Sequence, residues 1–231
     1  MKHRKEIISH WAQSIEATKY LELGLHNINE VFNHIPCNIK HSVDINDQFA
    51  DYTMSTDDFF NNLKSRKLNL DKDYKWDVIF IDANHLANFV KNDLLNSLNH
   101  LNDDGMIFLH DVLPPNYNAQ GEYSNCQTAW KVIPYILKHH PGLHVCTTDE
   151  IDGGLGIVFK NKLKDRKVLS ENYNIFYEFY IMDVDRKTSQ NYIPQSKVGE
   201  WVYNPYYNFE EENIDSKKNM YKDYYIKNNL T

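Results

Sequence analysis

Residues 76–115 carry the most regular pattern of apolar and polar positions in the chain. A strand is predicted over residues 77–81, where a continuous apolar run follows Asp77, as is typical of a parallel strand buried on both faces. From residue 86 to residue 101, apolar side chains recur at three- and four-residue intervals, which predicts a helix. Residues 103–105 (DDG) are expected to end that helix in a tight turn, and residues 106–109 form a second buried strand.

The same two patterns, short apolar runs that predict strands and three- to four-residue spacing that predicts helices, recur over most of the chain. Further strands are predicted at residues 20–24, 40–44, 143–148 and 154–159, with a strand end at Thr53. Further helices are predicted at residues 3–18, 27–34, 56–66, 127–139 and 174–192, the third of them capped by Ser55 or Thr56. Strands that alternate with helices and close with a hairpin predict an α/β fold: a doubly wound, mostly parallel sheet with antiparallel last strands and helices on both faces.

The chain divides into a main domain over residues 1–165, a helical extension of it over residues 166–201, and a tail over residues 202–231. The tail lacks clear periodicity, so it either docks on a partner subunit, giving a homodimer, or is poorly ordered. A long polar loop over residues 114–125 is expected to act as a lid or substrate loop.

Composition narrows the class of protein. Of the 231 residues, 42% are hydrophobic and 25% charged, which supports a folded core, and the net charge of −7 argues against a nucleic-acid-binding protein. No run reaches the roughly 20 apolar residues that span a bilayer, and no signal peptide is evident. Cys37, Cys126 and Cys146 lack metal-ligand spacing, so we expect free thiols and a cytoplasmic protein.

Candidate catalytic residues follow the two strands of the central unit. Asp82 and His85 come directly after the first strand, and His110 and Asp111 end the second. Ligands of open α/β sheets bind beyond the carboxyl ends of the strands, so these four side chains should face one crevice. A His-Asp pair also occurs in the metal dyad of phosphohydrolases, but that fold is helical, whereas this pair follows a buried strand.

The loop after the first predicted strand resembles a nucleotide site only in part. A dinucleotide fingerprint has three glycines, and Gly24 alone is present here. Asp44 lies twenty residues further on, where an acid accepts hydrogen bonds from both ribose hydroxyls of a nucleotide. Glu22 fits poorly beside a pyrophosphate but fits a ligand with an amino group, as S-adenosylmethionine has.

Several segments together resemble a known family, the class I S-adenosylmethionine-dependent methyltransferases. The likeness is greatest to a small branch found among sugar and polysaccharide genes, and it covers about residues 18–201. It rests on YLELG at 20–24, VDI at 43–45, MSTDDFF at 54–60, the FIDxxH…HDxxPP pattern at 80–115, QTAWKVI at 127–133, DGGLGI at 152–157, and residues 178–193. Two departures stand out, since Ala83 replaces the branch's usual glycine and the first loop has a single glycine.

The resemblance implies a Rossmann-like domain with a seven-stranded sheet and a role for each matching residue. Glu22 and Gly24 would border the methionine part of the cofactor, Asp44 the ribose, and Met54 with Ser55 the adenine. Asp82 and His85 would lie beside the sulfonium and the acceptor, and His110 and Asp111 would close the opposite wall.

Methyl transfer to a hydroxyl requires alignment of the acceptor and loss of its proton. His85 or His110 can act as the general base, because the usual pKa of histidine lies near neutrality. Alternatively, Asp82 and Asp111 can bind Mg²⁺ or another divalent ion that lowers the pKa of the hydroxyl. Trp130 and Tyr117 are candidates for the acceptor pocket, although Trp130 also fits the core.

The sequence therefore predicts an S-adenosylmethionine-dependent methyltransferase acting on an oxygen, or else a nitrogen, of a small polar acceptor such as a sugar or sugar nucleotide. Two alternatives stay open. One is a non-catalytic binding or scaffolding descendant of the same fold. The other is an NAD(P)-dependent oxidoreductase, which Glu22 and the missing glycines disfavour.

Overall fold

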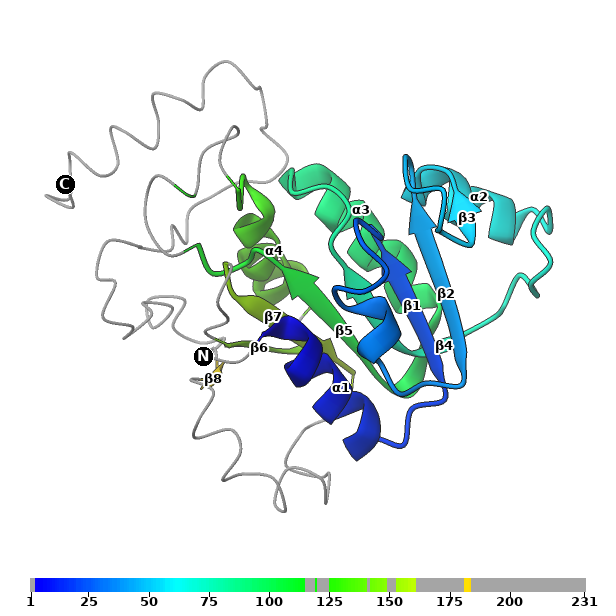
Figure 1. Cartoon of the computed structure of the whole chain (residues 1–231). Coiled ribbons are helices and arrows are strands. Elements are labelled where there is room, and N and C mark those ends of the chain that lie inside the picture. Colours follow the sequence, from blue (N-terminus) through cyan, green and yellow to red (C-terminus); the bar gives the residue numbers. More distant parts are fainter. Residues whose placement is uncertain are drawn as a thin grey trace, which may run out of the picture.

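A mixed sheet forms the centre of the molecule in the computed structural model, which describes residues 3–114, 119, 125–140, 142–148, 153–160 and 181–183 (Figure 1). The sheet has eight strands in the order β3-β2-β1-β4-β5-β7-β6-β8. The strands are β1 (Lys19–Leu23), β2 (Ile39–Asp44), β3 (Tyr52–Thr53), β4 (Trp76–Ile81), β5 (Leu101–His110), β6 (His144–Thr148), β7 (Leu155–Phe159) and β8 (Ile181–Asp183).

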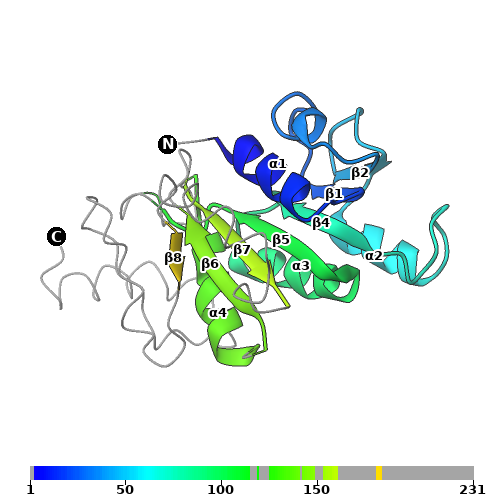
Figure 2. The same ribbon diagram turned by 90° about the horizontal axis from the view of Figure 1, so that it is seen from below.

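Helices cover both faces of this sheet. They are α1 (Arg4–Ser14), α2 (Thr56–Lys64), α3 (Ala87–Asn99) and α4 (Val132–His139), with short 3-10 turns η1 (Phe32–His34) and η3 (Ala129–Lys131). The apolar stripe of α1, which includes Ile8 and Trp11, packs on one face with Phe32 of η1. The other three helices pack on the opposite face, as Figure 2 shows for α3 and α4.

The direction of the strands confirms the predicted doubly wound fold. Strands β1 to β5 pair in parallel, whereas β7 runs antiparallel between β5 and β6. Strand β1 has β2 on one side and β4 on the other, so the chain crosses over there to build the other half of the sheet. Such a switch point leaves a crevice beyond the carboxyl ends of the strands.

The predicted helix over residues 174–192 is wrong at residues 181–183, which form strand β8. This strand pairs antiparallel with Cys146–Thr148 of β6 and so adds an eighth strand to the seven predicted. Pairing satisfies backbone groups at the edge of the sheet, and this gain outweighs the helical pattern of the segment. The tail over residues 202–231 lies outside the described residues.

The predicted helix over residues 27–34 is also wrong, since only the 3-10 turn η1 is helical there. The side chain of Asn27 accepts a hydrogen bond of 2.9 Å from the backbone N–H of Asn29. This local bond competes with the helical ladder, as asparagine side chains commonly do. The segment therefore stays an open loop, which becomes one wall of the cavity described below.

Residues 103–105 do not form the predicted turn but lie inside β5. Helix α3 ends at Asn99, and His100 is the only residue between it and the strand. The amide of Asn102 donates a hydrogen bond of 2.6 Å to Asp77, which ties this early part of β5 to β4. None of the helices in the described ranges is long and apolar enough to cross a membrane.

Candidate functional site

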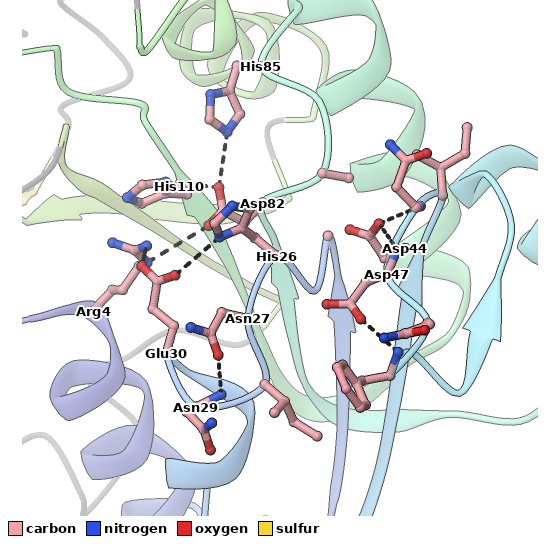
Figure 3. A pocket seen from close by; sticks show the side chains of 17 residues that line it. Arg4, His26, Asn27, Asn29, Glu30, Asp44, Asp47, Asp82, His85 and His110 are labelled. Atoms are coloured by element: carbon pink, nitrogen blue, oxygen red, sulfur yellow. Dashed lines mark hydrogen bonds and ion pairs between the residues drawn. The ribbon is translucent and has the colours of Figure 1, made fainter.

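A cavity of about 1190 Å³ opens at the carboxyl ends of β1, β2 and β4 (Figure 3). Its wall consists of the loops that follow these three strands, together with Arg4 of α1 and His110 at the end of β5. These segments lie far apart in the sequence, and the crossover at β1 brings them to one rim. The cavity is therefore at the place where open α/β sheets bind their ligands.

Gly24 lies in the cavity wall directly after β1. Its φ of +94° lies in the region that favours glycine, and a Cβ there would lie 2.3 Å from the carbonyl oxygen of Asp82. Its N–H donates to the carbonyl oxygen of Val43 at 2.8 Å, which joins it to β2. The residue is required for the close approach of the loops after β1 and β4.

Asp44 lies in the cavity wall at the end of β2. Its Oδ1 accepts hydrogen bonds from the backbone N–H groups of Asn46 (2.7 Å) and Asp47 (2.9 Å), which shape the following loop. That loop presents Ile45 and Phe49 in the wall, and these apolar side chains are 64% and 66% exposed. An acid beside exposed apolar side chains suits a ligand with both a polar ring and a flat apolar face.

Three predicted cofactor residues do not line the cavity. Glu22 is buried and accepts a hydrogen bond of 2.7 Å from the hydroxyl of Tyr20, and burial raises the pKa of this carboxyl to about 8. Met54 packs against the core and accepts from the amide of Asn62. Ser55 caps α2 by accepting from the N–H of Asp58 at 3.1 Å. Gly24, Asp44 and Asp82 do line it.

The four predicted catalytic residues form one cluster, with a ligand atom of each within 4.8 Å of the others. Asp82 Oδ1 lies 3.0 Å from His85 Nε2 and 2.9 Å from His110 Nδ1. Asp111 Oδ2 lies 2.9 Å from His85 Nδ1 and 3.4 Å from His110 Nδ1. Two imidazoles thus alternate with two carboxylates at the ends of β4 and β5.

The cluster changes the ionisation of its members. Burial by itself lowers the pKa of His85, but hydrogen bonds to Asp111 and Asp82 outweigh it and raise that pKa to about 10. Burial likewise acts to raise the pKa of both carboxyls, and the two histidines reverse this effect. The pKa of Asp111 falls to about 2, and that of Asp82 falls well below its usual range.

A second layer of residues orients Asp111. Its backbone is in the left-handed region at φ 58°, which is uncommon for a residue other than glycine. The thiol of Cys126 donates to Asp111 Oδ1 at 3.2 Å. A Cβ on Gly153 would lie 2.1 Å from the same oxygen, so only glycine fits there. These contacts fix the carboxylate so that Oδ2 faces the histidines.

Sequence reasoning missed Arg4 and Glu30. Arg4 is buried on α1, pairs with Glu30 Oε1, and places its Nε 3.8 Å from Asp82 Oδ2 (Figure 3). A signal was present, since Arg4 lies on the same helical stripe as Ile7, Ile8 and Trp11. A buried arginine on an apolar stripe indicates a partner within the protein.

The two aromatic candidates for the acceptor pocket have different outcomes. Trp130 is 1% exposed and belongs to the buried cluster that includes residues of α2, α3 and α4, so its assignment as a core residue is confirmed. Tyr117 lies outside the described residues.

Comparison with known proteins gives a family match and a set of similar folds. Residues 8–112 match a family model described as a methyltransferase domain. No curated protein matches the sequence. An O-methyltransferase from Bacillus cereus, in complex with SAH, has a TM-score of 0.53 and 13% identity over 68% of this chain and 80% of its own. The O-methyltransferase TomG from Streptomyces achromogenes, in complex with SAM and involved in tomaymycin synthesis, has a TM-score of 0.51 and 12% identity over 69% of this chain and 80% of its own.

At sequence identities of 12–13%, the similarity to these two structures concerns the fold alone. The family match spans β1 to β5 and includes Gly24, Asp44 and the whole four-residue cluster. The fold and the match agree with each other, and together they support a methyltransferase. The chain has the Rossmann-like methyltransferase fold, and residues 8–112 carry its match to a methyltransferase domain.

Proposed function

We propose that the chain transfers a methyl group from S-adenosylmethionine to an oxygen of a small polar acceptor, with a sugar or sugar nucleotide as the substrate class. A nitrogen acceptor is the second choice. The observation that carries the proposal is the shared cavity of Gly24, Asp44 and Asp82 at the switch point of a methyltransferase fold. A nucleoside with a cationic sulfonium fits a wall that has acids at both ends.

The cavity suggests one orientation for the cofactor. Oδ1 of Asp44 accepts the two backbone hydrogen bonds that shape the following loop. Its Oδ2 accepts no hydrogen bond from the described residues and is therefore available to ribose hydroxyls. Ile45 and Phe49 offer the adenine an apolar surface in the cavity wall. Met54 and Ser55 do not, because they lie outside that wall. The methionine part then crosses Gly24, and the sulfonium lies towards Asp82.

The reaction needs little covalent help from the protein. The acceptor oxygen attacks the methyl carbon as the carbon–sulfur bond breaks, the acceptor loses its proton, and S-adenosylhomocysteine leaves without the positive charge. Holding both partners in line supplies much of the rate enhancement. Asp82, the carboxylate of the cluster that lines the cavity, would attract the cationic cofactor more than its neutral product.

The acceptor proton can leave by either of two routes. As a general base, His85 would need a free ring nitrogen, but its Nε2 faces Asp82 and its Nδ1 faces Asp111 and the Asn125 carbonyl oxygen at 2.7 Å. Both nitrogens are therefore donors, which disfavours His85 as the base. Two carboxylates and two imidazoles fit a divalent ion, which when bound would lower the pKa of the acceptor hydroxyl.

The sugar-like acceptor rests on the pattern FIDxxH…HDxxPP at 80–115, which resembles a branch found among sugar and polysaccharide genes. A homodimer formed through the tail is part of the same proposal. The two alternatives are an NAD(P)-dependent oxidoreductase and a non-catalytic descendant of the fold. An oxidoreductase would need a glycine-rich loop for the pyrophosphate of NAD(P), and this loop has only Gly24. A non-catalytic descendant would share the architecture of the enzyme and differ from it only in lacking turnover.

A thermal-shift screen separates these functions. We expect S-adenosylhomocysteine to raise the melting temperature and NAD to leave it unchanged. Phe49→Ala should reduce the shift, whereas Phe89→Ala should not, because Phe89 is 44% exposed on α3 but outside the cavity wall. Stabilisation by NAD alone would favour the oxidoreductase. Stabilisation by S-adenosylhomocysteine without turnover on either hydroxyl or amine acceptors would leave a binding protein.

A further inference from the structure

We propose that Asp82, His85, His110 and Asp111 form a mixed nitrogen–oxygen centre that binds a first-row transition-metal ion in preference to Mg²⁺. The sequence predicted two carboxylate ligands and treated the histidines as alternative bases. This inference deepens the proposed function, and it rests on that function only for the use of the ion in methyl transfer.

The spacing of the four side chains is close to that of ligands around one ion, since a ligand atom of each lies within 4.8 Å of the others. Two donors at right angles on metal bonds of about 2.1 Å are separated by about 3.0 Å. Asp82 Oδ1 lies 3.0 Å from His85 Nε2 and 2.9 Å from His110 Nδ1, and His110 Nδ1 lies 3.4 Å from Asp111 Oδ2. The side chains thus need only small shifts to accept an ion.

The orientation of His85 favours a metal ligand. Its Nδ1–H donates to the backbone carbonyl oxygen of Asn125 at 2.7 Å and also lies near Asp111. Ligating histidines usually donate their second ring N–H to a carbonyl or carboxylate, which fixes the other nitrogen as the donor to the metal. Here that donor is Nε2, which faces Asp82 and would release its proton when it binds the ion.

Asp111 is held in the same way. Cys126 and the space left by Gly153 fix Oδ1 on the side away from the histidines. The left-handed backbone of Asp111 is the local cost of turning Oδ2 into the cluster. A carboxylate that merely formed a surface ion pair would not need such support.

The charges in the cluster suit a divalent cation. Histidine binds a metal ion as neutral imidazole, so as ligands the two carboxylates and two imidazoles would carry a charge of −2, which a divalent ion neutralises. Arg4 approaches Asp82 at 3.8 Å, but Glu30 pairs with its guanidinium, so this neighbouring pair adds no net charge.

The ligand types decide which ion is preferred. Mg²⁺ favours oxygen ligands and retains water, whereas imidazole nitrogen suits iron, cobalt, nickel and zinc. Manganese accepts both oxygen and nitrogen. A set in which half the ligands are imidazoles therefore selects a transition-metal ion, and this preference should disappear when the imidazoles are removed.

The test is a titration of the whole chain with Mn²⁺, followed by electron paramagnetic resonance. The free-ion signal should fall until one Mn²⁺ is bound per chain, and Mg²⁺ should displace it only at about tenfold excess or more. Pulsed spectra should also show coupling to a directly bound imidazole nitrogen. Displacement by equimolar Mg²⁺, absence of nitrogen coupling, or absence of binding would each overturn the inference.

Histidine variants make the test specific. His85→Asn and His110→Asn should each weaken Mn²⁺ binding and reduce its preference over Mg²⁺. His26→Asn is the matched control, since His26 lines the same cavity but is 94% exposed and outside the cluster. An equal effect of His26→Asn would contradict the proposal. Circular dichroism checks folding, and His85→Asn, at a partly exposed residue, decides the result if His110→Asn does not fold.

The titration contains neither cofactor nor acceptor, so the two proposals fail separately. Binding of S-adenosylhomocysteine without Mn²⁺ binding would refute the metal centre and leave the methyltransferase. Binding of Mn²⁺ without binding of S-adenosylhomocysteine would refute the methyltransferase and leave the metal centre.

Discussion

Asp44 has two separate tasks, one for each carboxylate oxygen. Oδ1 holds the loop that carries Ile45 and Phe49 by accepting from the N–H groups of Asn46 and Asp47. Oδ2 is the atom assigned to the ribose. A substitution at this residue can therefore disturb the shape of the loop, the ribose contact, or both.

Replacement of Asp44 by asparagine and by alanine separates the two tasks. Asp44→Asn keeps an oxygen for the loop but loses the carboxylate, and Asp44→Ala loses both. We expect alanine to weaken S-adenosylhomocysteine binding by about 1–3 kcal/mol, the range for polar groups left unpaired, and asparagine by less. Calorimetric titration measures both, and unchanged affinity in Asp44→Ala would refute the ribose contact.

Glu22 makes stability depend on pH in a defined window. Its pKa in the folded chain is about 8, whereas the ordinary value is 4.5, so the folded state keeps a proton that the unfolded state loses between these pH values. Stability should therefore fall as pH rises from 4.5 to 8 and change little from this group outside that window. The cause is burial of a carboxyl whose hydroxyl partner, Tyr20, cannot compensate for lost solvation.

Glu22→Gln should remove this part of the pH dependence. Urea unfolding at pH 5 and pH 9 should show the variant gaining stability relative to the wild type at the higher pH, by an amount on the order of a few kcal/mol. The exposed substitution Glu16→Gln is the control. An identical pH dependence in wild type and Glu22→Gln would contradict the assignment.

The cap of helix α2 distinguishes a structural role of Ser55 from a contact with the adenine. Ser55 caps this helix, and its hydroxyl also donates to Asp58 Oδ2 at 2.7 Å. Ser55→Ala should lower the free energy of unfolding by about 1 kcal/mol, the usual cost of a lost cap, without changing affinity for S-adenosylhomocysteine. A clear loss of affinity would instead support the adenine contact implied by family resemblance.

The elements that could be predicted are those whose own residues determine them. The apolar run of β4, the stripe of α3 and the cap of α2 each carry a complete local signal, and each is found where expected. The loop before η1 and the beginning of β5 were mispredicted, because a side-chain bond from Asn27 and pairing with β4 outweigh local preference. Strand β8 depends on an edge supplied by β6, which the local sequence does not encode.

At the scale of the whole molecule, the same limit applies to the site. The cluster of Asp82, His85, His110 and Asp111 could be predicted because parallel neighbouring strands bring their carboxyl ends to one edge. Arg4 and Phe49 could not, because each reaches the cavity from a segment whose path depends on packing. The sheet thus fixes the chemistry, while α1 and the loop after β2 shape the space around it.

The crossover at β1 also divides the cavity into two ends with different tasks. One end has Asp44 with the exposed apolar side chains of its loop, and the other has the charged cluster with Arg4 and Glu30 (Figure 3). Gly24 joins the two ends where no side chain would fit. A long ligand that is polar at its middle and reactive at one end is the kind that such a cavity accepts.

The proposed cofactor site is tested most directly by the position of S-adenosylhomocysteine in a crystal structure of its complex with this chain. We expect the ribose hydroxyls at the carboxylate of Asp44, the adenine against Phe49, and the sulfur facing Asp82. Electron density for the ligand anywhere other than this rim of the sheet would contradict it, as would an empty cavity in crystals saturated with S-adenosylhomocysteine.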